Sequence, residues 1–355
     1  MGRHIPITLG NIKPIAFDDN APDLGKIALV CEGGGQRGIF TAGVLDEFLR
    51  VGFNPFDIMV GTSAGAQNLS AYLCQQRGYA RKVITDYTTK SQFFSPLRFI
   101  RGGHMIDLDW LIEITSRELP LDFSTGLSCL DSGRQFLISA CRYEDFSPVY
   151  FQPTQDSWLD IIRASSAIPG FYRQGAVFNG QLYHDGGITA SIPVEEAYRR
   201  GAKTIVVIRT VPSGIYYTSE WLKRMTRWLE HRNIRRMAKM IKVHIKSYQQ
   251  TQKFIAAPPP DIQIFEIYPP KPLMSCALGS RAANLNSDYH IGRQCGRYFL
   301  TSLRDYFASN DAASYPYSIE NNQMVNSASL SANMTSNQQD EEPKSGDEGL
   351  VIDVR

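Results

Sequence analysis

Short apolar runs alternate with helix-length stretches along the first 210 residues. Continuous apolar runs are typical of buried strands, and apolar residues three or four positions apart are typical of amphipathic helices. The predicted strands are Lys26–Cys31, Phe56–Val60, Gln135–Ala140, Val149–Phe151, Leu182–Asp185 and Thr204–Ile208. The predicted helices contain Val44–Leu49, Ala66–Leu73, Trp158–Ile168 and Pro193–Arg200. This alternation predicts an α/β fold, a parallel sheet with helices on its faces.

The pattern divides the chain into four parts. In the first part the apolar residues show no helix or strand periodicity. The second part holds the α/β alternation, and the third adds one strand at 262–267 and one helix at 288–307. The last part is rich in Ser, Asn and Gln and predicts disorder, because it holds too little apolar surface to order itself. The parts are an N-terminal arm (1–24), an α/β core (25–210), a C-terminal extension packed on the core (211–308) and a disordered tail (309–355).

Composition and charge narrow the classes of function. The 355 residues carry a formal net charge of +2, which is too small to indicate nucleic-acid binding. The six cysteines lack CxxC spacing, so neither a zinc site nor a disulfide framework is expected. We expect a cytoplasmic protein, because no signal peptide begins the sequence and no apolar run is long enough to cross a bilayer. Contact with the inner face of a membrane stays open, and the oligomeric state is not determined.

A glycine-framed serine follows the strand predicted at Phe56–Val60. The pattern Gly61-Thr62-Ser63-Ala64-Gly65 has the G-x-S-x-G spacing of a nucleophile elbow, a sharp turn from strand to helix. The glycines leave room for the chain to fold tightly around the central residue, which takes strained backbone angles. A strand-to-helix turn with a chance serine is the alternative interpretation.

A glycine loop follows the first predicted strand. Gly33-Gly34-Gly35-Gln36-Arg37-Gly38 satisfies the G-x-G-x-x-G fingerprint of dinucleotide binding. That fingerprint requires an acidic residue at the end of the second strand, whereas here Asp57 precedes or begins that strand and Ser63 follows it. Backbone N–H groups of such a loop hold either a phosphate or an oxyanion, and the serine favours the oxyanion. Arg37 is expected to brace the loop by pairing with a carboxylate, with a lipid phosphate as the alternative partner.

Asp185 is the candidate base. It ends a short predicted strand and is followed by Gly186 and Gly187, which allow close approach to its carboxylate, although Asp-Gly is also a common turn. A histidine-based triad is the alternative, with His231, His244 or His290 as its third member. His184 is expected to point to the opposite face from its neighbour Asp185. A serine–aspartate dyad is the simpler hypothesis.

Four blocks of the chain together resemble the patatin-like phospholipases. They are Gly33–Gly38, Gly61–Gly65, Ala164–Pro169 and Asp185–Gly187, within a resemblance that covers about 26–209. The resemblance implies a three-layer α/β/α sandwich with a mainly parallel central sheet. It also implies a Ser-Asp dyad that hydrolyses lipid acyl esters without metal or cofactor. Ser63 is then the nucleophile, Asp185 the base, and the amides of the Gly33–Gly38 loop the oxyanion hole.

The resemblance favours a phospholipase A or lysophospholipase that acts on membrane-lipid esters. Two hypotheses of other classes remain beside it. The first is a dinucleotide- or phosphate-binding protein that uses the glycine loop, and the second is a catalytically silent lipid-binding module. Binding of a nicotinamide cofactor would distinguish the first, and reaction with a fluorophosphonate would distinguish the second.

A basic stretch, Trp221–Lys246, is a candidate membrane contact. It holds nine Lys and Arg residues against the single acid Glu230, a formal charge of +8, and its apolar residues recur at helical spacing. Such a helix can rest on an anionic bilayer or pack its apolar face on the sheet, and both remain open. Upstream, 91–130 mixes aromatic and basic residues, which fits either a cap over a substrate channel or a surface helix pair.

Overall fold

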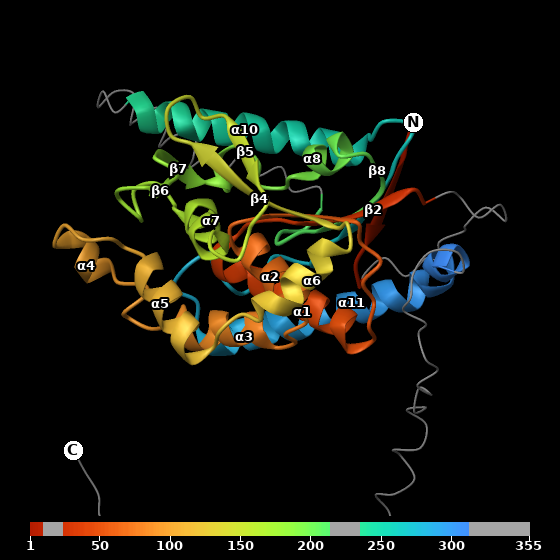
Figure 1. Cartoon of the computed structure of the whole chain (residues 1–355), viewed down its shortest axis with the longest axis horizontal. Helices are drawn as coiled ribbons and strands as arrows, with labels where there is room; N and C mark the ends of the chain where they lie inside the picture. Colours follow the sequence, from red (N-terminus) through yellow and green to blue (C-terminus); the bar gives the residue numbers. More distant parts are fainter. Residues whose placement is uncertain (10–23, 214–234, 312–355) are drawn as a thin grey trace, which may run out of the picture. The chain divides into compact units, whose positions relative to one another are not determined.

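The structure, a computed structural model, describes residues 1–9, 24–213 and 235–311, and a single sheet of nine strands lies at its centre (Figure 1). Eight strands follow the order β1-β9-β8-β2-β3-β4-β7-β6, and β5 pairs with β4. The strands are β1 (Arg3–Ile7), β2 (Lys26–Cys31), β3 (Ile58–Thr62), β4 (Gln135–Arg142), β5 (Pro148–Phe151), β6 (Ala176–Phe178), β7 (Gln181–Asp185), β8 (Ala202–Ile208) and β9 (Gln263–Ile267).

The sheet is parallel from β1 to β4 and antiparallel beyond. Each neighbouring pair along β1-β9-β8-β2-β3-β4 is parallel, whereas β4 pairs antiparallel with both β5 and β7, and β7 with β6. The parallel strands place their carboxyl ends at one edge of the sheet, where loops can converge on a site. The predicted α/β fold with a mainly parallel sheet is confirmed.

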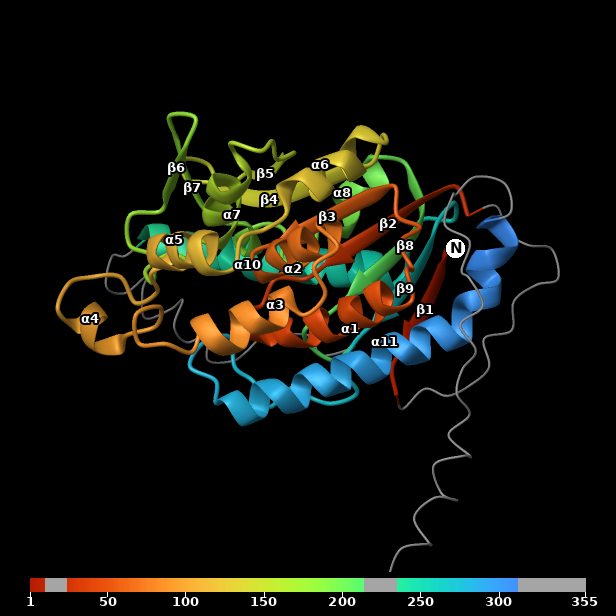
Figure 2. The same cartoon turned by 60° about the horizontal axis from the view of Figure 1, so that its bottom comes forward.

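Helices cover both faces of the sheet, which gives three layers (Figures 1 and 2). One face is covered by α1 (Gly38–Arg50), α2 (Ala64–Leu73) and α11 (Ala282–Asp311), and the other by α8 (Val194–Arg199) and α10 (Arg235–Ala256). The remaining α-helices are α3 (Tyr79–Lys82), α4 (Pro96–Ile100), α5 (Leu108–Glu118), α6 (Phe123–Asp131) and α7 (Trp158–Ser166). A π-helical turn covers Val83–Tyr87, and short 3-10 helices cover Gly35–Arg37 and Gly186–Ile188. Within the described residues, no helix combines the length and the apolar character needed to span a membrane.

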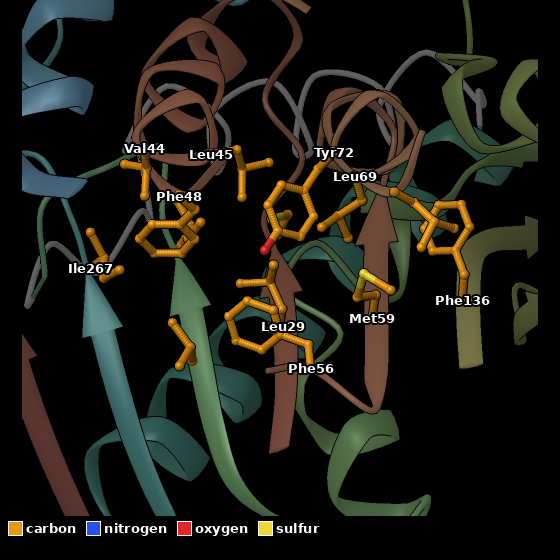
Figure 3. Packing of buried hydrophobic residues seen from close by; sticks show 14 of the residues in the cluster. Leu29, Val44, Leu45, Phe48, Phe56, Met59, Leu69, Tyr72, Phe136 and Ile267 are labelled. Atoms are coloured by element: carbon orange, nitrogen blue, oxygen red, sulfur yellow. The ribbon is translucent and has the colours of Figure 1, made fainter. Parts of the chain in front are cut away.

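Each face of the sheet has its own apolar core. Leu29 of β2, Met59 of β3 and Phe48 of α1 belong to one cluster, part of which is drawn in Figure 3. The alternate residues Val30 and Val60 belong to a second cluster on the opposite face, with residues of α8 and α10. Strands buried on both faces explain the continuous apolar runs in the sequence.

The structure corrects the prediction that residues 1–24 form a surface arm. Arg3–Ile7 is a strand that pairs in parallel with β9, and Ile7 belongs to the main core. The signal in the sequence is weak because the strand has five residues and includes Pro6, a residue that sheets tolerate at their edges. The rest of the predicted arm, residues 10–23, lies outside the described residues.

The structure also corrects two predictions for the C-terminal region, the extent of the sheet and the bounds of the last helix. The strand expected at 262–267 is β9, which lies inside the sheet between β8 and β1, so the sheet continues past residue 210. The last helix runs from Ala282 to Asp311, earlier and later than the predicted 288–307, and it enters the segment expected to be disordered. Residues 221–234 of the basic stretch and residues 312–355 of the tail lie outside the described residues.

Candidate active site

Ser63 occupies a strained turn between β3 and α2. Its backbone angles are φ 52° and ψ −121°, in a left-handed region that residues other than glycine seldom adopt. The flanking glycines are needed because a Cβ at Gly61 would lie 2.7 Å from the Ala66 Cα, and one at Gly65 would lie 2.4 Å from the Cys31 carbonyl oxygen. The serine is therefore presented at the carboxyl edge of the sheet, at the start of α2.

The end of α7 holds this turn in place. The Ser63 amide donates a hydrogen bond to Ser165 Oγ at 2.8 Å, and Gln67 Nε2 donates to Ser166 Oγ at 3.0 Å. Both serines lie in the Ala164–Pro169 block, to which the sequence analysis assigned no role. The sequence indicated these serines only as members of the Ala164–Pro169 block. Their hydrogen-bond partners, Ser63 and Gln67, follow from the packing of α7 beside α2.

Asp185 meets Ser63 although 122 positions separate them in the sequence. The Asp185 amide donates to the Ala167 carbonyl at 2.9 Å, and its Oδ1 accepts from the Gly187 amide at 2.7 Å. The Ser63 hydroxyl lies close enough to this carboxylate to lower its pKa. Burial raises the pKa of Asp185 to about 6, against the two hydrogen bonds, which lower it.

Glycines after Asp185 shape its loop. A Cβ at Gly186 would lie 2.3 Å from Ser139 Oγ, and one at Gly187 would lie 2.9 Å from the Asp185 Oδ1 atom itself. Any larger residue at either position would displace the carboxylate or the neighbouring strand β4. The glycine pair, which was expected to allow close approach to the carboxylate, also packs tightly against Ser139 and Asp185.

The glycine loop lies beside Ser63, and the structure narrows its candidate oxyanion donors. A Cβ on Gly33 would lie 3.6 Å from Ser63 Cβ, but the Gly33 amide donates to the Ser191 carbonyl at 3.0 Å. The amides that are also engaged with backbone carbonyls are those of Gln36, Arg37 and Gly38. Within the described residues, the amides of Gly34 and Gly35 donate to no acceptor. The oxyanion hole stays a prediction, for which the amides of Gly34 and Gly35 are the remaining candidates within the loop.

Side chains within the loop fix its conformation. Gln36 Nε2 donates to Thr88 Oγ1 at 3.0 Å, and Gln36 Oε1 accepts from the Ser280 amide at 2.8 Å. Arg37 Nε donates to the Gly34 carbonyl at 3.5 Å. Arg37 thus braces the loop through a carbonyl oxygen, and in the described part of the chain it has no carboxylate partner, contrary to prediction.

A buried cluster of charges anchors the start of the loop. Glu32 Oε2 accepts from the Thr210 amide at 2.6 Å and from Arg209 Nε at 3.3 Å, while Oε1 accepts from the Tyr248 hydroxyl at 2.8 Å. Arg209 also pairs with Glu266 of β9. Buried charges require such pairing, because an unpaired charge would lose its hydration without compensation.

Helix α10 supports the base loop. His244 Nδ1 lies 2.7 Å from the Gly187 carbonyl oxygen, and Ser247 Oγ donates to the Thr189 carbonyl. Since a carbonyl only accepts, Nδ1 carries the proton. Burial lowers the pKa of His244, which favours the neutral ring. His244 therefore binds the backbone of the loop and not the Asp185 carboxylate.

The other histidines do not complete a triad in the described residues. His184 packs against Tyr143, with ring centroids 5.2 Å apart, and burial together with the charge of Arg236 lowers its pKa to about 4. His290 is exposed on α11. His231 lies outside the described residues.

A largely apolar cavity opens beside Ser63. Its empty volume, with the space at its open mouth included, is about 980 Å³. Gly35 and Gln36 lie on its wall near the serine. Its apolar lining includes Val83, Ile84, Phe93, Ile106, Leu108, Leu111, Ile162 and Ile168. Such a lining suits a hydrocarbon chain.

Asp57 has a place in the fold that argues against a dinucleotide site. Its Oδ2 accepts from the Ile27 amide at 2.8 Å, where β2 begins. The glycine loop follows the other end of the same strand, after Cys31. Asp57 therefore lies at the opposite edge of the sheet from the loop, where it cannot hold a ribose.

Comparison with known proteins gives two family matches. Residues 29–198 match the patatin-like phospholipase model, and residues 234–308 match a domain of unknown function, DUF6363. The second match includes α10, β9 and most of α11.

Similar proteins include one long match and several partial ones. The uncharacterized protein YjjU of Escherichia coli is 60% identical over 85% of this chain and 84% of its own length. Lysophospholipase NTE1 of Candida albicans is 28% identical over 51% of this chain, which covers only 13% of that relative. Human GIVD cytosolic phospholipase A2 aligns with a TM-score of 0.42 and 13% identity over 80% of this chain and 59% of its own. Through residues 29–198 the chain belongs to the patatin-like phospholipase family.

Proposed function

We propose that this protein is a serine acyl hydrolase that cleaves fatty-acyl esters of membrane lipids, of the phospholipase A or lysophospholipase type. The observation that carries the proposal is that Ser63, whose backbone is strained, lies beside the buried Asp185 carboxylate and lines an apolar cavity. Strain at a non-glycine residue persists where the surrounding structure maintains it, often at functional sites. The family match and the lysophospholipase among the relatives support the same class of reaction.

The dyad accounts for formation of the acyl enzyme. Asp185 accepts the proton of the Ser63 hydroxyl as Oγ forms a bond to the acyl carbonyl carbon. The carbonyl oxygen becomes an oxyanion, for which the amides of Gly34 and Gly35 are the candidate donors. The bond from carbon to the alcohol oxygen then breaks, and the leaving alcohol takes the proton from Asp185.

Hydrolysis of the acyl enzyme repeats these steps with water. Asp185 removes a proton from water as its oxygen adds to the acyl carbon, and Ser63 Oγ leaves with that proton. A pKa of about 6 leaves Asp185 mostly ionised at pH 7, yet close enough to neutrality to receive a proton. The pair needs no further titratable group to complete the cycle.

The cavity is the feature that selects a lipid substrate. An acyl chain bound along Ile84, Ile106 and Leu111 would bury its hydrocarbon surface and present its carbonyl carbon to Ser63. The alternative of a dinucleotide site is disfavoured by the place of Asp57. A silent lipid-binding module would use the same cavity and differ only in lacking turnover.

The deciding measurement is release of fatty acid from mixed phospholipids and of p-nitrophenol from a short-chain ester. We expect Ser63→Ala and Asp185→Asn each to lower the rate by about 10²–10⁴-fold, the range for loss of a positioned catalytic group. Matched controls are Ser287→Ala and Asp261→Asn, which change exposed residues on α11 and before β9. Circular dichroism and thermal unfolding check that each variant is folded.

Reaction with a fluorophosphonate separates the alternatives. The wild-type protein should be labelled at Ser63, and Ser63→Ala should not. Full activity in Ser63→Ala would contradict the proposal. A wild-type protein that binds lipid but shows neither turnover nor labelling would be a silent module.

A further inference from the structure

The segment from Lys90 to Met105 forms a projection that carries α4 at its tip. In Figures 1 and 2 it stands apart from the body, and Figure 2 shows it at the opposite end from β1. Leu97 is 56% exposed and Ile100 is 80% exposed. Five large hydrophobic residues are exposed in the described chain, and two of them lie on this one helix of five residues.

The exposure of these side chains is fixed by the fold of the segment. Ser95 caps α4, because its Oγ accepts from the Arg98 amide at 3.2 Å. The Arg98 guanidinium donates to the carbonyls of Phe93 at 2.9 Å and His104 at 2.8 Å, and so ties the two sides of the projection together. Phe93 and Ile106 are buried at its base. The tip therefore holds Leu97 and Ile100 outward on an ordered support.

Positive charge surrounds the tip. Residues 90–105 contain Lys90, Arg98 and Arg101 and no acidic residue. The adjoining segment 168–183 contains Arg173 and also no acidic residue. Arg173 lies over the Phe99 ring, 4.7 Å from its centroid, and donates to the Phe99 carbonyl at 3.0 Å. A nearby acid is Asp107, which lies 3.8 Å from Arg98.

The first turns of α10 adjoin the same surface. A Cβ on Gly170 would lie 3.7 Å from the Met237 methyl group, so the 168–173 turn lies between α10 and the projection. Arg235, Arg236 and Lys239 are exposed on those turns. Arg236 is also stacked on Tyr143, 3.7 Å from the ring centroid. This places part of the predicted basic stretch beside the 168–173 turn, which adjoins the projection at Met105.

The projection also forms part of the cavity wall. Phe93 and Ile106 at its base line the cavity that contains Ser63, and Ile168 lines it from the adjoining turn. One continuous structure thus leads from the exposed apolar tip to the serine.

We propose that this tip docks on an anionic lipid bilayer, with Leu97 and Ile100 inserted among the acyl chains and Arg101 and Arg173 at the lipid phosphates. Exposed apolar residues beside the cations of segments 90–105 and 168–183, which themselves hold no acidic residue, complement such a surface. The docking deepens the proposed function, on which it rests for the identity of the substrate. Binding itself requires no catalysis and can be measured without it.

The test uses the full chain with Ser63→Ala, so that vesicles stay intact. Co-sedimentation is measured with vesicles of phosphatidylcholine alone and of phosphatidylcholine mixed with phosphatidylglycerol. We expect binding to the mixed vesicles that weakens with salt, and we expect Leu97→Ser with Ile100→Ser to reduce affinity at least about tenfold. Arg101→Gln with Arg173→Gln should reduce it several-fold on the mixed vesicles only.

Met274→Ser is the matched control, because Met274 is 56% exposed but follows β9, outside the projection and its adjoining turns. It should leave vesicle affinity unchanged. With Ser63 restored, hydrolysis of a soluble short-chain ester shows that the Leu97 and Ile100 variant is folded, since neither side chain lines the cavity.

Three results would overturn the docking proposal. They are a parent protein that sediments with neither vesicle, a double variant that binds as well as the parent, and a double variant that changes only self-association in ultracentrifugation. The last result would make the tip an interface between copies. Vesicle binding without ester hydrolysis would contradict the proposed function and leave the docking proposal intact. Ester hydrolysis without vesicle binding would contradict the docking proposal and leave the proposed function intact.

Discussion

Asp185 is a weaker acid than an exposed aspartate because it is buried beside Ser63. Desolvation disfavours the charged carboxylate, and the hydrogen bonds from Gly187 and Ser63 only partly offset this effect. The group accepts a proton only in its ionised form. The resulting pKa of about 6 therefore sets the pH below which the proposed base is inactive.

The pH dependence of the reaction follows from this pKa. For a soluble ester we expect kcat/KM to fall about tenfold per pH unit below pH 6 and to be level from pH 7 to 8, because the protonated carboxyl cannot take the Ser63 proton. Initial rates from pH 4.5 to 8 measure this, with circular dichroism at each pH. A profile that is flat across pH 5–7 would remove Asp185 as the base.

At the scale of single residues, much of the candidate site is readable from the sequence. Gly61 and Gly65 mark the turn because only glycine avoids the close backbone contacts there. The part played by Ser165 is not readable, because its hydroxyl reaches the Ser63 amide only through the packing of α7. Whether a loop amide already has a backbone acceptor likewise depends on tertiary packing, so the sequence cannot tell the amides of Gly34 and Gly35 from the other four.

Helix α10 is the element that connects the C-terminal region with the site. His244 holds the base loop, and four residues later Tyr248 reaches the glutamate before the glycine loop. The helical spacing places both side chains on one face. The sequence marks this helix by its basic residues, whereas its inner face carries the contacts with the site. Those contacts depend on how the helix docks and cannot be derived from charge or periodicity.

His244→Ala should lower kcat about tenfold and leave KM for a soluble ester nearly unchanged. The Gly187 carbonyl would lose one of its two side-chain donors and keep the Ser191 hydroxyl, so the loop that carries Asp185 would be held less precisely. His244→Asn should restore most of the rate, because its side-chain amide can donate from a similar position. Lys246→Ala, at an exposed position of the same helix, is the control. Equal rates in the alanine variant and wild type would show that His244 has no positioning role.

At the scale of the whole molecule, the sheet joins residues from both ends of the described chain. β1 reaches the sheet only through β9, and His4 Nε2 lies 2.8 Å from Glu266 Oε2. The periodicity of the first 210 residues predicted the central strands well. It did not reveal this pairing, because a strand of five residues gains its stability from a distant partner.

Ile7 tests whether the N-terminal strand belongs to the core. We expect Ile7→Ala to lower the free energy of unfolding by about 2–5 kcal/mol, because the side chain is 1% exposed within the main apolar cluster. Arg3→Ala, at an exposed position of the same strand, should change it by less than about 0.5 kcal/mol. Urea unfolding followed by tryptophan fluorescence measures both. Equally small effects would favour the surface arm over the strand.

The order of the strands has a consequence for synthesis on the ribosome. The partners His4 and Glu266 are 262 residues apart, so at roughly 5–20 residues per second β1 waits on the order of 10–50 s for β9. Ser63 and Asp185 are both translated before α10, whose His244 and Tyr248 hold the loops around them. A nascent chain therefore contains the dyad before it contains the support for the dyad. The contacts that hold the loops of the site form only after α10 has left the ribosome and packed on the sheet.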